Sequence, residues 1–289
     1  MNGILMGALV ALSMAQQTDT VIAVDGATRL DVEADGGTIV VNAWERNEIR
    51  VQAAHSSRTF VEITRTRNGT IQVESEANRG PAGITDFTIM VPATLALDLE
   101  GMYTDITVEG SNATVEAETV QGSITIRGGR GTVRASTATG EILIESAEGN
   151  IDVESAASDI RLVNVSGDVV AESAGGDIVF ESSRATTVDA GSTGGRIQYH
   201  GTFQAAGRYF FGSHGGSVML VVPEGTAATF NLATIHGSVT TNVNGPLERL
   251  ERGRRNTVTV GGGGALVEVE TFGGRIAVMR QGTEGALQQ

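Results

Sequence analysis

The central part of the chain repeats a pattern of apolar and polar positions every nine residues, from Thr104 to Arg184. Each unit has Ile or Val at its third place and a second apolar residue at its fifth, separated by a more polar one. Such alternation is typical of a strand with one buried face. Gly or another small residue at the first place favours a turn. The third-place residues are Ile106, Val115, Ile124, Val133, Ile142, Ile151, Ile160, Val169 and Ile178.

The fifth place alternates between large and small residues, so the structural unit is two nines, or 18 residues. Ala117, Ile126, Ala135 and Ile144 show this alternation. We predict an all-β, parallel β-solenoid in which each coil lays one strand on each of two walls. Large residues of one wall then pack against small residues of the other. A Greek-key sandwich is the competing fold, but it does not explain one register held over consecutive units.

The flanking segments are related but less regular. Gly195, Gly216 and Gly237 recur at 21-residue spacing, which predicts coils that widen to about 21 residues, and the step at Gly274 ends the series. Residues 16–100 alternate more extensively, and Asn68-Gly69 is a hairpin signal. We expect a β-rich N-terminal cap over 16–100, solenoid repeats over 101–282 and a flexible tail over 283–289. A helical turn is expected within 246–252.

The first 15 residues have the pattern of an export signal. An apolar run over 4–12 is followed by Ser13-Met14-Ala15, a small-x-small cleavage pattern, although no basic residue precedes the run. The run is too short to span a bilayer. The competing interpretation is a buried N-terminal element. We expect cleavage after Ala15 and a product exported to the periplasm, the cell surface or the medium, without a transmembrane segment.

Composition narrows the classes of function. The net charge is -14, and all 20 basic residues are Arg. Nucleic-acid binding is not expected, because it needs grouped cations. The absence of Cys excludes disulfides and thiolate chemistry and, in an exported protein, favours a bacterial envelope. We expect no cofactor and no resident metal.

Several motifs resemble a bacterial exported family of unknown function that is described by its β-strand repeats and provisionally labelled adhesin. The resemblance rests on the strand that ends at Val91-Pro92, the following Gly-x-Ile steps, Val222-Pro223 and the Gly-rich closing segment 261–276. It covers roughly residues 20–282. It implies a β-repeat fold and an adhesin-like role, and it brings no catalytic residues.

One inferred wall carries a candidate interaction surface. Glu141, Asp159 and Asp177 fall on successive coils in one outward row. This row is interpreted as a solvated acidic stripe or as a divalent-cation ladder. Apolar residues also point outward there, which indicates cover by the N-terminal part, by loops or by a partner. Besides the three acidic residues, the surface consists of Leu143, Arg161, Val163 and Val179.

Two other groups of residues are candidates for binding. His214 and His236 each precede a Gly-Ser-Val step. They are interpreted either as two stacked metal ligands or as isolated turn residues. Tyr199, Phe203, Tyr209, Phe210 and Phe211 form an aromatic-rich region, either packing the wider coils or stacking on sugars.

The sequence therefore predicts a non-catalytic envelope or surface protein, adhesin-like or a scaffold, whose partner is an unknown protein or glycan. Oligomers are possible through the solenoid ends. The alternatives are a polysaccharide-acting β-helix enzyme and a Ca²⁺-dependent interaction module.

Overall fold

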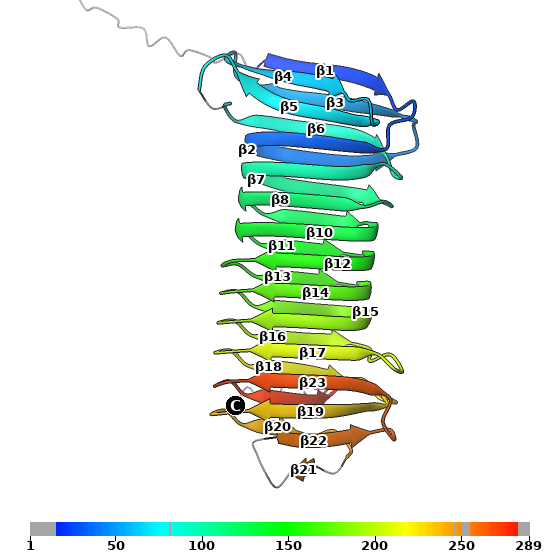
Figure 1. Ribbon diagram of the computed structural model, residues 1–289, viewed down its shortest axis with the longest axis vertical. Coiled ribbons are helices and arrows are strands. Elements are labelled where there is room, and N and C mark those ends of the chain that lie inside the picture. Colours follow the sequence, from blue (N-terminus) through cyan, green and yellow to red (C-terminus); the bar gives the residue numbers. More distant parts are fainter. Residues whose placement is uncertain (1–15, 81, 246, 250–254, 283–289) are drawn as a thin grey trace, which may run out of the picture.

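The computed structural model describes residues 16–80, 82–245, 247–249 and 255–282. These residues form a rod of stacked strands (Figure 1) and contain no helix. The all-β, parallel solenoid is confirmed. The expected export signal at 1–15 and the tail at 283–289 lie outside the described residues. No described segment is a helix long and apolar enough to cross a membrane.

The strands differ in length, and three of them, β2, β7 and β15, bend around a corner of the coil. In chain order the strands are β1 Gln16–Ala23, β2 Arg29–Trp44, β3 Glu48–His55, β4 Thr59–Arg65, β5 Thr70–Ala77, β6 Thr85–Pro92, β7 Ala96–Ser111, β8 Val115–Gln121, β9 Ile124–Gly128, β10 Arg130–Thr139, β11 Ile142–Glu145, β12 Glu148–Ser155, β13 Ile160–Val163, β14 Ser166–Ser173, β15 Ile178–Ser192, β16 Ile197–Gly201, β17 Arg208–Ser213, β18 Val218–Val222, β19 Ala228–Thr234, β20 Val239–Thr241, β21 Leu247–Arg249, β22 Arg255–Val260, β23 Ala265–Thr271 and β24 Ile276–Arg280.

Strands 18 residues apart pair in parallel, as the large-and-small alternation predicts. Ile124 of β9 pairs with Ile142 of β11, and Val133 of β10 pairs with Ile151 of β12. We call the wall that contains β9, β11 and β13 wall A, and the wall that contains β8, β10, β12 and β14 wall B. The first part of β15 belongs to wall A and its second part to wall B.

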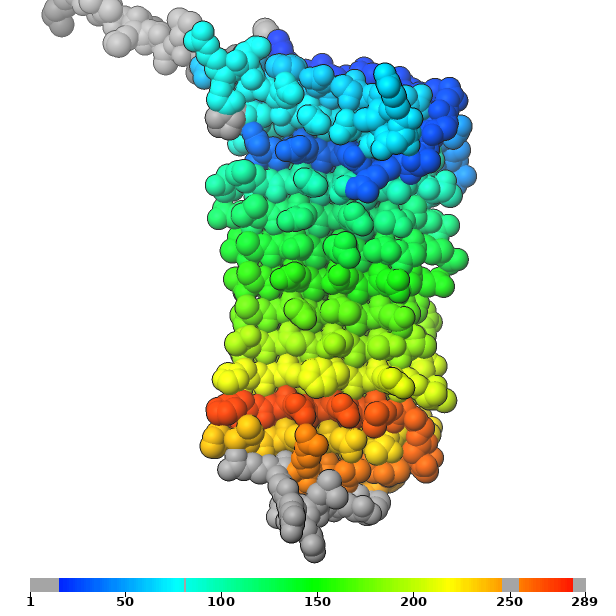
Figure 2. Space-filling model, in the orientation of Figure 1, coloured from blue at the N-terminus to red at the C-terminus, as the bar shows by residue number. Residues whose placement is uncertain are grey.

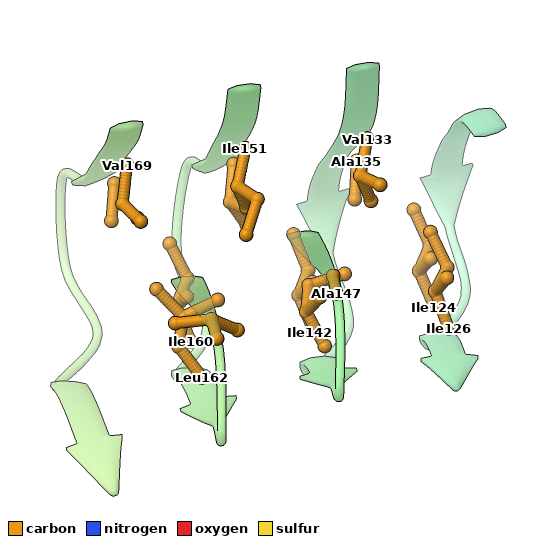
Figure 3. Close-up of a cluster of buried hydrophobic side chains, with 14 of the residues drawn as sticks. Ile124, Ile126, Val133, Ala135, Ile142, Ala147, Ile151, Ile160, Leu162 and Val169 are labelled. Atoms are coloured by element: carbon orange, nitrogen blue, oxygen red, sulfur yellow. The ribbon is translucent and has the colours of Figure 1, made fainter. Parts of the chain in front are cut away.

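A narrow apolar core fills the space between the walls (Figure 3). Ile126, Ile144 and Leu162 of wall A are fully buried, and so are Ala135 and Val153 of wall B. Large residues on one side and smaller ones on the other let the walls approach without voids. Each coil contributes few core residues, so its stability depends on its neighbours.

At the C-terminal end, the order of the coils in space differs from their order in the chain. β23 pairs in parallel with both β17 and β19, and β24 pairs with both β18 and β20. The last coil of the chain is therefore inserted between two earlier ones, as Figure 1 shows. The step at Gly274 is the last along the chain, but it is not the last in space. It lies between Gly216 and Gly237, because every coil carries the same local pattern and fits either neighbour.

The N-terminal end has the same arrangement. β2 precedes β3 to β6 in the chain but lies between β5 and β6 on one side and β7 on the other. The hairpin at Asn68-Gly69 is confirmed, since β4 and β5 pair antiparallel around it. β1 and β3 add further antiparallel pairing. Parallel winding already begins at Arg29, whereas the domain boundary near residue 100 stays a prediction.

The helical turn expected within 246–252 is wrong where the structure describes it. Leu247–Arg249 form β21, which pairs antiparallel with β22. A segment this short gains little from helix formation, because nucleating a helix is unfavourable. Pairing with β22 instead occupies the backbone groups of a sheet edge.

Candidate functional site

The acidic row predicted on wall A connects neighbouring coils. The Asp159 carboxylate accepts a hydrogen bond from the Asp177 backbone N–H at 2.8 Å. The Asp177 carboxylate in turn accepts a hydrogen bond from the Arg196 backbone N–H at 2.7 Å. It also forms an ion pair with the Arg196 guanidinium at 2.9 Å. Within the described residues, no group of three or more His, Asp and Glu side chains is arranged to hold a metal ion. The two aspartates therefore have a structural role, since their carboxylates link neighbouring coils by hydrogen bonds. Glu141 is exposed.

The remaining residues of the predicted surface lie on the open face of wall A. Leu143 pairs with Arg161, which pairs with Val179, and all three side chains point outward. Arg161 forms an ion pair with Glu181 at 2.8 Å, and Val163 is half-buried. Of the three kinds of cover considered, the N-terminal part does not cover them, because β1 to β6 continue the rod at its end (Figures 1 and 2). A partner on this surface stays a prediction.

A different surface is built at the corner where wall B leads into wall A. Four successive corners there have the sequence Ser/Thr-x-Gly-Gly, as in Ser173-Ala174-Gly175-Gly176. The Ser173 hydroxyl accepts a hydrogen bond from the Gly176 N–H at 2.9 Å and donates one to the Ser158 carbonyl at 3.3 Å. This buried hydroxyl closes the turn and joins it to the preceding coil.

The same hydroxyl contact recurs in later coils. Ser192 accepts from the Gly195 N–H and Ser213 from the Gly216 N–H, both at 2.9 Å. The glycines are required by close approach of the backbones, since a Cβ added at Gly274 would lie 1.7 Å from the Gly216 carbonyl oxygen. Each corner therefore packs closely against the corners of the neighbouring coils, and the side chain of its x residue points into solvent.

The four x residues, together with Ala156 and Ile235 at the equivalent place of the two flanking corners, form an exposed row along one edge of the rod, which we call the edge row. Backbone hydrogen bonds between successive corners fix its order in space. The row changes from small side chains in the middle of the rod to aromatic and branched ones at its C-terminal end. Its members are Ala156, Ala174, Thr193, His214, Phe272 and Ile235.

A hollow of about 730 Å³ adjoins the aromatic end of the edge row. Gly212 and Ala233 lie beside Glu270 on the two neighbouring strands. Because neither has a large outward side chain, the sheet surface is open to solvent on both sides of Glu270. Arg255 lies at the far end of the hollow, with its guanidinium 3.6 Å from the Glu270 carboxylate. Phe210 lines the hollow as well. A volume of this size is within the range of small-ligand sites.

Aromatic rings give this hollow its character. The ring of His214 is stacked on that of Phe272, with centroids 4.8 Å apart and planes 11° apart. This separation equals the spacing of neighbouring strands, so the two rings are stacked along the rod axis. Phe272 is 44% exposed. Phe210 lies against Gly212, where a Cβ would meet its Cε1 at 3.0 Å.

A second hollow, of about 430 Å³, continues the first toward the middle of the rod. It shares Gly212 and His214 with the first hollow and reaches Glu172 and Glu154 over the side-chain-free Gly191. We call the two hollows together the edge groove. Its lining residues lie on seven neighbouring strands, from β12 to β22, which corresponds to a length of about 29 Å.

The aromatic-rich region predicted from the sequence divides between the core and this groove. Tyr199, Phe203, Tyr209 and Phe211 are buried, and the rings of Tyr199 and Phe211 lie 5.3 Å apart. Burial raises the pKa of the Tyr199 hydroxyl and of the Tyr209 hydroxyl. Packing of the wider coils therefore accounts for these four, and Phe210 alone faces the groove.

The hypothesis of a metal bound between His214 and His236 is wrong. Phe272 lies between them, stacked on His214 and 5.1 Å from the His236 ring. The inserted last coil is the reason, and the chain order gave no sign of it. The Ser/Thr-x-Gly-Gly repeats were the overlooked signal, because their x residues are the exposed ones.

Comparison with known proteins places the chain in a family. The family described as Toastrack DUF4097 matches residues 27–279. The chain belongs to this family. No curated protein matches this Toastrack chain. A crystal structure of a protein from Clostridium sporogenes, provisionally described as a cell adhesion protein, is similar at 10% identity and a TM-score of 0.23. The similarity covers 92% of the Toastrack chain and 100% of that chain.

Proposed function

We propose that this Toastrack protein is a non-catalytic binding rod of the bacterial cell envelope or surface, with an adhesin-like or scaffolding role. The observation that carries the proposal is the edge groove, in which exposed Phe272 and half-buried Phe210 adjoin a hollow of about 730 Å³. Coil-to-coil hydrogen bonds make the rod a stiff support for such a site. The signal-like sequence of residues 1–15 supports export.

The arrangement of carboxylates in the groove supports binding rather than glycoside hydrolysis. Hydrolases of this kind use two carboxyl groups about 5–9.5 Å apart. Glu270 lies three strand steps from Glu172, about 14 Å along the rod. Glu154 and Glu172 are closer, but neighbouring glutamates also occur far from the groove, as at Glu100 and Glu118. Adjacent glutamates are thus a property of wall B rather than of a reaction site.

An envelope-binding assay tests this function. The full-length gene product, carrying a C-terminal tag, is expressed in a bacterium and purified from the fraction in which it accumulates. We expect it outside the cytoplasm, with a mass that shows cleavage after Ala15. It should sediment with purified bacterial envelopes, and Phe272→Ala should weaken this binding.

Phe60→Ala is the matched control, because Phe60 is 39% exposed on β4, at the opposite end of wall B. Cytoplasmic accumulation, or equal envelope binding by wild type and Phe272→Ala, would contradict the proposal. Release of new reducing ends from polysaccharide would support the enzyme alternative. A melting temperature raised by Ca²⁺ and lowered by chelator would support the ion-dependent one.

A further inference from the structure

We infer that the edge groove binds an uncharged polysaccharide chain, lying along the rod axis with its sugars over successive coils. This inference rests on the proposed function and specifies the ligand. The groove is linear and open along the rod, so it suits an extended polymer better than a compact molecule. Each sugar of an extended chain advances by about 5 Å, close to one strand spacing.

The aromatic rings provide surfaces for sugar rings. One face of His214 is covered by Phe272, so its other face is directed toward Thr193 and the second hollow. Phe210 offers a second ring at the wall of the first hollow. The apolar C–H faces of a pyranose pack on aromatic rings, which bury a large area with little loss of conformational freedom. The glycine floor lets the chain approach the sheet closely.

The polar groups of the groove match hydroxyl groups. Glu270, Glu172 and Glu154 accept hydrogen bonds, and the Arg255 guanidinium donates them. Sugar hydroxyls both donate and accept, so they satisfy either type. Hydrogen bonds to ionised groups are stronger than neutral ones.

The charge of the groove disfavours a polyanion. Its lining includes three carboxylates and one guanidinium, and the whole chain has a net charge of -14. Acidic polysaccharides and phosphate-rich polymers would be repelled along the whole contact. An uncharged chain avoids this repulsion.

An extended peptide fits the groove less well. Peptides that bind to sheets usually add a strand to a free edge through main-chain hydrogen bonds. The strands beneath the groove already pair on both sides. β17 lies between β15 and β23, and β19 lies between β23 and β22. Recognition here therefore depends on side chains, as in carbohydrate binding.

Affinity electrophoresis tests the inference with a matched pair of polymers. Hydroxyethylcellulose and carboxymethylcellulose share a backbone and differ in charge, and dextran and galactomannan extend the uncharged set. We expect at least one uncharged polymer to retard the wild-type protein, and carboxymethylcellulose to retard it less than hydroxyethylcellulose does. Phe272→Ala should weaken retardation at least about tenfold, as expected for a central aromatic contact. Phe60→Ala should leave it unchanged.

Glu270→Gln is a second variant for the case that Phe272→Ala does not fold, and it should also weaken retardation. Retardation by none of the uncharged polymers, or equal retardation of wild type and the groove variants, would overturn the inference. Treating the envelopes with periodate or with proteinase distinguishes a failure of this inference from a failure of the proposed function. Periodate, which cleaves vicinal diols, should abolish envelope binding. If proteinase abolishes binding and periodate does not, the ligand is a protein: the polysaccharide is excluded and the binding rod is retained.

Discussion

The middle of the rod and its C-terminal end are built from the same kind of coil but are ordered differently. Between β8 and β15, each coil lies on the one that precedes it in the chain, and all pairing is parallel. Beyond β17 the chain skips one level, turns back through β21 and β22, and fills the vacant level with β23 and β24.

The difference shows how a solenoid closes its ends. A plain last coil would present a row of unpaired backbone groups, which promotes aggregation. At the C-terminal end the last coil, β23 and β24, is placed inside, and antiparallel β22 lies farther out. At the N-terminal end the first parallel coil, β2, is placed inside, and antiparallel β1, β3 and β4 lie outside it. The ends of the repeat are thereby held by neighbours on both sides, which limits fraying.

The core also changes between the two regions. In the middle it consists of Ile and Leu against Ala and Val. Near the wider coils, Phe180 contacts the rings of Tyr199 and Phe211, with centroids 5.4 and 6.4 Å away. Larger rings fill the larger cross-section of these coils. The C-terminal part therefore depends on a few large side chains, and the middle on many small ones.

Cysteine cross-linking should give an all-or-none test of the inserted coil. The chain has no Cys, so introduced pairs are unambiguous. Glu268 and Asn231 are cross-strand neighbours, whereas β23 separates Phe210 from Asn231. A disulfide needs Cα atoms within about 7 Å. Glu268→Cys with Asn231→Cys should therefore oxidise to a disulfide, detected by peptide mapping. A disulfide in Phe210→Cys with Asn231→Cys instead would show that the coils follow chain order.

Removing a core ring should have the largest effect on stability. Phe180 is fully buried, so Phe180→Ala should lower the free energy of unfolding by about 3–5 kcal/mol. Phe60→Ala, at the exposed surface of β4, should lower it by less than about 1 kcal/mol. Urea denaturation measures both. Comparable losses would show that burial of the Phe180 ring does not set its contribution to stability.

The aspartate hydrogen bonds between coils of wall A should contribute less to the free energy of unfolding than the Phe180 ring does. Asp159→Ala removes the acceptor for the Asp177 N–H and should lower the free energy of unfolding by about 1 kcal/mol. Glu141→Ala is the matched control from the same row and should have no effect within error. Thermal and urea denaturation give the measurement. If Ca²⁺ stabilised wild type and not Asp159→Ala, the row would be a cation site after all.

The smallest effect is expected at the N-terminal strand. A hydrogen bond from Arg50 holds the pKa of Asp19 below its ordinary value and ties β1 to β3. A lowered pKa stabilises the folded state above the ordinary pKa, and this contribution is lost as the pH falls through the lowered value. Amide exchange in β1, corrected for intrinsic rates, should therefore accelerate relative to β12 between about pH 5 and about pH 2.5. Asp19→Asn should remove this dependence.

The strands and the two walls could be predicted from the sequence, because both depend on which residues alternate along short segments. The alternation at Ile124 and Ile126 required a strand, and the 18-residue alternation of size required two walls. The candidate site was harder to predict. Attention to outward carboxylates led to Asp159 and Asp177, which bind backbone N–H groups. The Ser/Thr-x-Gly-Gly motif marks Phe272 as an exposed corner residue, but only the inserted coil places its ring beside that of His214.

The sequence by itself determined the coil: its period, its two walls, its core and its glycine corners all follow from side-chain size and backbone sterics within a few residues. Tertiary structure decided which coil lies beside which, because identical patterns pair equally well and only the burial of the open ends selects among them. That choice placed Phe272 between His214 and His236 and assembled the edge groove.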